Sequence, residues 1–203
     1  MGAGRKPAGA QSGVSHLRRP SLNRHLPVHI TLRVRPQVWN LRTRRCFRFI
    51  ERAFGVGCDR FGFRLVHFSV QRNHFHLVCE GNDRRALSRG LQGIAIRLAK
   101  GLNAVMGRKG RVFADRYHEH VLRTPSEVKH AVHYVLHNAS HHRQPLERAV
   151  DPFCSLAATQ ACVTARSWLL CNATAGARPK PRAPTATFPK TDGRFQVQFG
   201  IRR

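Results

Sequence analysis

The chain has 203 residues and a formal net charge of +26, because 36 lysines and arginines outnumber 10 aspartates and glutamates. A positive charge of this size predicts a polyanionic partner. A hydrophobic content of 41% is enough for the core of one domain with tails. No apolar run of about 18 residues occurs, which excludes a membrane-spanning segment. Six cysteines without a CxxC pair, and a start without an apolar leader, predict a reduced, cytoplasmic protein.

The chain divides by composition into a folded body and two flanking segments. Residues 1–25 carry five basic and no acidic residues among Gly, Ala, Ser and Pro, which predicts a disordered basic arm. Residues 151–203 form an extension that we expect to be largely irregular, with a proline-rich basic tail from 171 onward. Between the tails, residues 26–170 hold 24 basic and 9 acidic residues, a difference of +15, so the body itself is electropositive.

The first half of the body predicts two kinds of element. Residues 28–34 alternate and are rich in branched side chains, as in a strand, whereas apolar residues in 44–54 recur at helical spacing. Residues 63–70 and 74–80 are two strand-like runs, and the three residues between them are few enough for a hairpin. The predicted order is therefore strand, helix, strand, strand.

The second half predicts a helix, an extended segment and a final helix. Apolar residues keep a spacing of three or four over 84–106, and residues 111–124 are extended in character. Thr124-Pro125-Ser126-Glu127 is a capping box that starts a helix running to about residue 142. This order predicts an α/β (α+β) ferredoxin-like split-βαβ sandwich, in which an antiparallel sheet carries helices on one face.

Candidate chemistry falls on the predicted 74–80 strand and on the final helix. His74 and His76 alternate with a phenylalanine, so both imidazoles project from one face, although such a pair is also consistent with ordinary surface histidines. Tyr134 and Asn138 lie one turn apart on one side of the helix. Two imidazoles and an amide oxygen would suit Mg²⁺ or Mn²⁺ beside a phosphate, with a tyrosine as nucleophile. Tyr117 is the other tyrosine of the chain, and we favour Tyr134 because of its amide neighbour.

These segments together resemble the single-tyrosine HUH transposases, especially the REP-associated tyrosine transposases. Residues 67–80, with Asn73-His74-Phe75-His76, resemble the family's histidine strand, and similar segments follow at 87–103, 111–128 and 130–142. The resemblance implies that residues 26–150 are the catalytic domain. It also implies that His74, His76 and Asn138 bind Mg²⁺ or Mn²⁺, and that Tyr134 attacks a DNA phosphate. In such enzymes the tyrosine forms a 5′-phosphotyrosyl link that a 3′-hydroxyl later reverses, on single-stranded DNA near imperfect hairpins.

The expected partner is hairpin-forming single-stranded DNA, which implies a protein associated with the nucleoid. We expect the protein to be a monomer or homodimer and to bind no membrane. A non-catalytic nucleic-acid-binding module or an inactive transposase relic remains an alternative interpretation. A third alternative, a zinc hydrolase built on the two histidines, lacks a third ligand, since Cys79 faces away and Glu80 is four residues beyond His76. Candidate DNA-binding side chains are Arg72, Arg84, Arg85, Arg89, Arg97, Lys109, Arg111 and Arg116.

Overall fold

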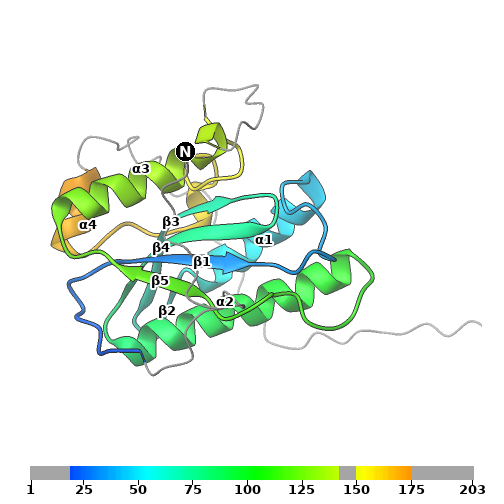
Figure 1. Ribbon diagram of the computed structural model, residues 1–203, viewed down its shortest axis with the longest axis horizontal. Coiled ribbons are helices and arrows are strands. Elements are labelled where there is room, and N and C mark those ends of the chain that lie inside the picture. The colour runs from blue at the N-terminus through cyan, green and yellow to red at the C-terminus, as the bar shows by residue number, and fades with distance from the viewer. Residues whose placement is uncertain (1–18, 142–149, 175–203) are drawn as a thin grey trace, which may run out of the picture.

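The computed structural model describes residues 19–141 and 150–174, so the predicted arm and tail lie mostly outside the described residues. The elements follow the predicted order, with boundaries close to those expected from periodicity (Figure 1). They are β1 (Val28–Arg33), α1 (Arg44–Gly57), β2 (Asp59–Arg60), β3 (Phe63–Val70), β4 (His74–Gly81), α2 (Arg84–Val105), β5 (His118–Val121), α3 (Pro125–His141), a 3₁₀ turn (Thr159–Ala161) and α4 (Trp168–Thr174).

The strands form one antiparallel sheet in the order β2-β3-β4-β1-β5. Without the two-residue strand β2, this is the strand order of the ferredoxin-like split-βαβ fold, which confirms the predicted fold class. The 111–124 segment differs from expectation, because only residues 118–121 pair continuously with β1. Its earlier part touches the sheet through an isolated bridge between Phe113 and Val34.

Helices cover both faces of the sheet. α1 and α2 pack on one face, over a core whose largest fully buried side chains include Phe54, Phe63, Phe68 and Phe75. α3 and α4 pack on the other face, around a smaller cluster that includes Val66 and Val78 (Figure 1). The sheet and the α1/α2 layer therefore make up the predicted split-βαβ sandwich. The final helix, α3, adds a further layer on the face that carries the histidines.

The capping box at the start of α3 forms as the sequence predicts. The Glu127 carboxylate accepts the backbone N–H of Thr124 at 3.2 Å, and the Thr124 hydroxyl accepts the backbone N–H of Glu127 at 3.2 Å. These two reciprocal hydrogen bonds satisfy backbone N–H groups at the start of the helix and so fix where α3 begins. Because residues three or four apart lie on the same side of a helix, the position of its start also fixes which residues face the sheet.

Residues 150–174 pack against the sheet, which the sequence did not predict for this part of the extension. Arg42 donates two hydrogen bonds to the Asp151 carboxylate, both at 2.9 Å, and Cys154 forms an isolated bridge with Ser69 of β3. Leu169 and Leu170 of α4 then complete the apolar cluster under α3. This segment thereby holds α3 against the sheet.

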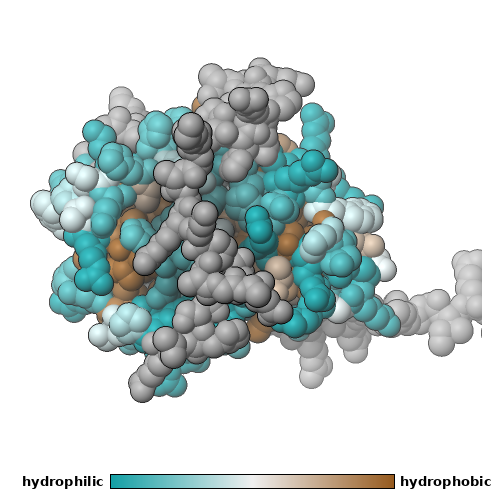
Figure 2. All heavy atoms as spheres, in the orientation of Figure 1, coloured by the Kyte–Doolittle hydropathy of each residue, from teal (hydrophilic) through white to brown (hydrophobic). Residues whose placement is uncertain are grey.

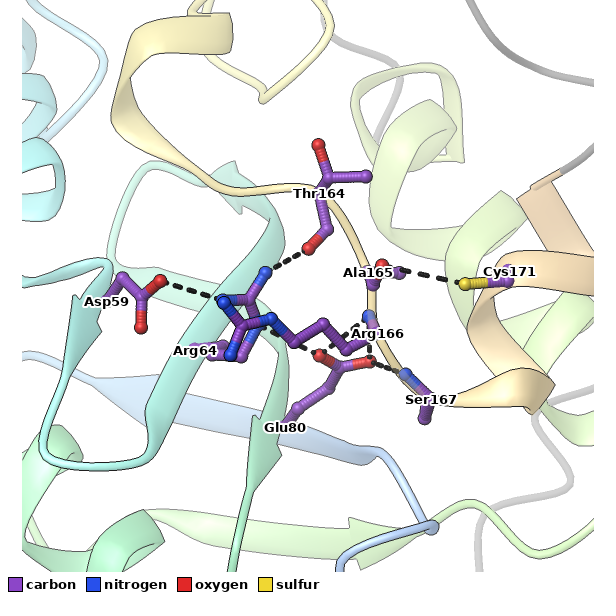
Figure 3. Close-up of polar contacts among 8 residues, drawn as sticks. All are labelled: Asp59, Arg64, Glu80, Thr164, Ala165, Arg166, Ser167 and Cys171. Carbon is purple, nitrogen blue, oxygen red and sulfur yellow. Dashed lines mark hydrogen bonds and ion pairs between the residues drawn. The ribbon is translucent and has the colours of Figure 1, made fainter.

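A buried ion-pair cluster fastens the same segment to β3 and β4 (Figure 3). Glu80, 4% exposed, accepts the backbone N–H groups of Arg166 at 3.0 Å and Ser167 at 2.7 Å. Arg64 donates to Glu80 at 3.3 Å, to Asp59 at 2.7 Å and to the carbonyl of Thr164. The cluster satisfies buried backbone donors just before α4 and so sets where that helix docks.

Candidate active site

Strand alternation places His74 and His76 on the α3 side of the sheet. Phe75 between them is fully buried in the α1/α2 core, which fixes the direction of both imidazoles. Their Nε2 atoms face each other at 3.0 Å. The Asn73 amide oxygen lies 2.8 Å from His74 Nδ1, so it accepts the proton of that nitrogen and leaves His74 Nε2 with a lone pair. A hydrogen bond of this kind to the Nδ1 atom is how a metal-binding histidine is held with its Nε2 atom toward the metal.

His76 has two further neighbours on β1 that the sequence analysis did not single out. His29 Nε2 lies 3.1 Å and Thr31 Oγ1 lies 3.3 Å from His76 Nδ1. Burial lowers the pKa of His29 to about 4, with smaller contributions from the charges of His120 and His118. His29 is therefore neutral near pH 7. The alternation of residues 28–34 puts His29 and Thr31 on one face, but their pairing partner becomes apparent only from the register of β1 with β4.

α3 brings Tyr134 to the imidazoles. The centroid of its ring is 5.2 Å from that of His76 and 6.2 Å from that of His29, and both contacts are edge-on. Tyr134 is 37% exposed, because Val128, Val132 and Val135 take the buried side of the helix. A phenol that is held beside the imidazole pair and remains open to solvent can be reached by a substrate.

Tyr117, the other candidate nucleophile, lies on the opposite side of the sheet. Its hydroxyl is 3.4 Å from the Ser88 hydroxyl of α2, and the Arg19 guanidinium stacks on its ring at 3.5 Å from the centroid. The ring packs against the α1/α2 core. Of the two tyrosines, the structure therefore brings only Tyr134 to the histidines.

Asn138, one turn beyond Tyr134, is fully buried, and its amide oxygen and nitrogen have no hydrogen-bond partner among the described residues. Leaving a buried amide unpaired costs about 1–3 kcal/mol, so such a group calls for an explanation. An amide oxygen and two imidazole nitrogens have donor atoms that suit Mg²⁺ or Mn²⁺ completed by phosphate and water. In the chemistry of their donor atoms, His74, His76 and Asn138 therefore fit a divalent metal.

A zinc site has less support. In the described part of the chain, no group of three or more His, Cys, Asp or Glu side chains is placed to hold a metal. Cys79 is fully buried on the α1/α2 side, where burial raises the pKa of its thiol well above its usual value. Glu80 is engaged with Arg64 and two backbone N–H groups. Neither residue can supply the third ligand that the zinc alternative needs.

The predicted DNA-binding residues fall into three places. Arg72 is exposed in the turn that leads into His74. Arg84, Arg85, Arg89 and Arg97 lie on α2, which covers the face opposite the histidines, and Arg84 is paired with Glu119 at 2.7 Å. Lys109, Arg111 and Arg116 are exposed between α2 and β5. Only Arg72 of this set lies beside the histidine strand.

The sheet order, the histidine pair and the tyrosine helix together define an α+β sandwich with a candidate site on the α3 face of its sheet. A solved REP-associated tyrosine transposase bound to a REP hairpin matches the chain with a TM-score of 0.57 and 19% sequence identity, over 70% of this chain and 82% of that one. A putative transposase from Deinococcus radiodurans R1 aligns with a TM-score of 0.41 and 9% identity, over 65% of this chain and 98% of that one. No known protein-family profile matches the sequence. No curated protein matches it either.

The first of these similarities confirms, at the level of the fold, the resemblance that the sequence motifs indicate. The chain has the fold of a REP-associated tyrosine transposase. Within the described residues, every helix is too short or too polar to cross a lipid bilayer.

Proposed function

We propose that this protein is a single-tyrosine transposase, which cleaves and rejoins single-stranded DNA at hairpin-flanked sites. The observation that carries the proposal is the position of Tyr134, whose ring lies 5.2 Å from that of His76 while the two Nε2 atoms of the histidine pair face each other at 3.0 Å. The similar solved structure was bound to a REP hairpin, which supports hairpin DNA as the partner. The net charge of +26 supports a polyanionic substrate, and hydrophilic residues cover most of the described surface seen in Figure 2.

In this proposal, His74, His76 and Asn138 hold Mg²⁺ or Mn²⁺. The cation would act as a Lewis acid on a phosphate oxygen of the scissile link. The Asn73 hydrogen bond orients the imidazole of His74 and burial orients that of His76, so little reorganisation would be needed when the phosphate binds. The cation would be the partner of the Asn138 amide oxygen, which has no hydrogen-bond partner among the described residues.

Tyr134 provides the nucleophile. Its hydroxyl oxygen forms a bond to phosphorus as the bond from phosphorus to the 3′-oxygen breaks, and the phenolic proton is transferred, through a base or solvent, to the departing 3′-oxygen. The products are a 5′-phosphotyrosine and a free 3′-hydroxyl. Rejoining is the reverse step with the same or another 3′-hydroxyl, and the phenol is then the leaving group. The phosphotyrosyl bond conserves the energy of the broken link, so no nucleotide cofactor is needed.

The test is a covalent adduct. The protein is incubated with labelled single-stranded hairpin oligonucleotides from the flanks of its own gene, with Mn²⁺ or with EDTA, and resolved on a denaturing gel. We expect a shifted band that requires Mn²⁺, disappears in Tyr134→Phe and persists in the matched control Tyr117→Phe. His74→Ala should lower adduct yield at a fixed Mn²⁺ concentration. DNA binding without adduct under all conditions would contradict the proposal and favour a non-catalytic binding module or a relic.

A further inference from the structure

Trp39 is an exposed aromatic residue in the loop between β1 and α1. It is 48% exposed, whereas Val38 just before it and Leu41 two residues after it are 8% and 0% exposed. A single exposed apolar side chain is common on protein surfaces and by itself indicates nothing. What distinguishes Trp39 is how firmly its loop is held and where that loop lies.

The loop is fixed along its length by hydrogen bonds. The backbone N–H of Val38 donates to the carbonyl of Arg35 at 3.0 Å, and the Asn40 side chain accepts the N–H of Arg42 at 3.0 Å. The Arg42 guanidinium then reaches the Val70 carbonyl at 3.0 Å and the Asp151 carboxylate at 2.9 Å. The backbone that carries the indole therefore has little conformational freedom left to lose on binding.

The same loop is tied to the turn that carries the histidine strand. The N–H of Leu41 donates to the carbonyl of Arg72 at 3.0 Å, and the N–H of Val34 donates to the carbonyl of Asn73 at 2.9 Å. Asn73 in turn contacts His74 through its side chain at 2.8 Å. The loop that carries Trp39 is therefore linked, by a short chain of hydrogen bonds, to the edge of the candidate active site.

The surroundings of the indole are strongly basic. Residues 33–45 contain no acidic residue and five arginines, which are Arg33, Arg35, Arg42, Arg44 and Arg45. All of these except Arg42 are exposed, as is Arg72 in the neighbouring turn. An exposed indole on a firmly held loop among arginines is a combination that suits single-stranded nucleic acid, in which a base stacks on the ring and the adjacent phosphates contact the guanidinium groups. It fits an apolar protein partner less well, because such a partner would have to desolvate the arginines.

We propose that Trp39 is a stacking platform for an unpaired nucleobase of the single-stranded DNA that enters the histidine site, with the exposed arginines of its loop contacting the neighbouring phosphates. This inference rests on the proposed function and adds a base contact to it. Stacking on an indole does not select one base by hydrogen bonding, so the contact favours single strands over duplex without specifying sequence.

The chain has two tryptophans, Trp39 and Trp168, so each can be observed alone by fluorescence. Full-length Trp168→Phe protein, with Trp39 as its only tryptophan, is titrated in EDTA with a single-stranded twelve-nucleotide oligo(dT). An abasic strand of the same length and a duplex of the same length are titrated in parallel. Trp39→Phe protein reports Trp168, which is also exposed, at 68%, and serves as the matched control.

We expect oligo(dT) to quench Trp39 emission, the abasic strand and the duplex to leave it nearly unchanged, and Trp168 emission to respond to none of them. Trp39→Ala should weaken oligo(dT) binding by about 5- to 150-fold, the range of one stacked base, while Trp39→Phe retains most of the affinity. Unchanged Trp39 emission at saturating oligo(dT), or wild-type affinity in Trp39→Ala, would overturn the inference. So would equal quenching by the abasic strand, because phosphate contact alone would then account for it.

EDTA separates this test from that of the proposed function. If Trp39 emission is quenched by oligo(dT) but no covalent adduct forms with Mn²⁺, the stacking site stands and the transposase chemistry fails. If adduct forms without a Trp39 response, the reverse holds.

Discussion

Removing the Glu80 carboxylate should destabilise the fold more than any other single charge removal that we consider. The group is 4% exposed and accepts hydrogen bonds from Arg64, Arg166 and Ser167 (Figure 3). In Glu80→Ala the Arg64 guanidinium loses one of two carboxylates, and the backbone N–H groups of Arg166 and Ser167, the second of them buried, lose their acceptor. Breaking a buried pair from one side costs about 3–5 kcal/mol. For a chain of this size that corresponds to a fall in melting temperature of about 6–20 °C.

The matched control is Asp59→Ala, which removes the other carboxylate from the same guanidinium. Asp59 has 46% of its side chain exposed and lies 2.7 Å from Arg64, so solvent screens the pair. We expect a loss below about 1 kcal/mol. Urea denaturation gives the free energy of unfolding of four variants, which are Glu80→Ala, Asp59→Ala, Arg64→Ala and the double variant Arg64→Ala/Glu80→Ala.

The two residues should be coupled, so the double variant should lose less stability than the sum of the single variants. Strictly additive losses, or a Glu80→Ala protein within about 1 kcal/mol of wild type, would refute the assignment of this cluster as the anchor of the segment before α4.

Two further predictions concern packing and pH. A Cβ at Gly90 would lie 2.0 Å from Phe63 Cγ, so Gly90→Ala should destabilise the protein by about 1–3 kcal/mol despite its higher helix propensity. The control is Gly93→Ala, where the added Cβ would meet only the flexible Arg97 Nη1 at 3.2 Å, so this variant should be neutral or more stable by up to about 1 kcal/mol. Equal melting temperatures for the two variants would contradict the close packing of Gly90 against Phe63. Burial lowers the pKa of His67 to about 4, against a smaller opposite effect of Glu80. The unfolded chain therefore binds a proton at His67 at a higher pH than the folded protein does. The contribution of the neutral His67 to the free energy of unfolding is complete above the unfolded pKa of about 6.5 and is lost as the pH falls toward 4. His67→Gln should flatten the decline in unfolding free energy over that interval by up to about 3 kcal/mol, and an unchanged slope would show that His67 is not the cause.

Local periodicity accounts for what the sequence predicts well. The strand-like runs 63–70 and 74–80 form β3 and β4, and side chains of both strands are buried under α1 and α2 on one face and under α3 and α4 on the other. Helical spacing also predicts which side of α3 is buried, and therefore that Tyr134 lies at its boundary. The strand order follows, since few topologies connect these elements without crossing.

What the sequence could not predict depends on contacts between distant residues. Asp151 meets Arg42 across 109 positions, and no periodic pattern signals such a pair. His29 joins the histidine pair only through the register of β1 with β4. The apolar stripe of α2 shows which side of the helix is buried but not which face of the sheet it covers. The α2 arginines, which are predicted to bind DNA, lie on a helix that covers the face opposite the histidines, and the sequence gives no sign of that placement.

The most direct test of the account is to identify the amino acid that carries the DNA. The protein is incubated with Mn²⁺ and a hairpin oligonucleotide from the flanks of its gene. The adduct is digested with protease and nuclease, and the modified peptide is sequenced by mass spectrometry. The account predicts a 5′-phosphonucleotide on Tyr134 that is absent when EDTA replaces Mn²⁺. A nucleotide on Tyr117, or hairpin binding with no modified peptide, would contradict it.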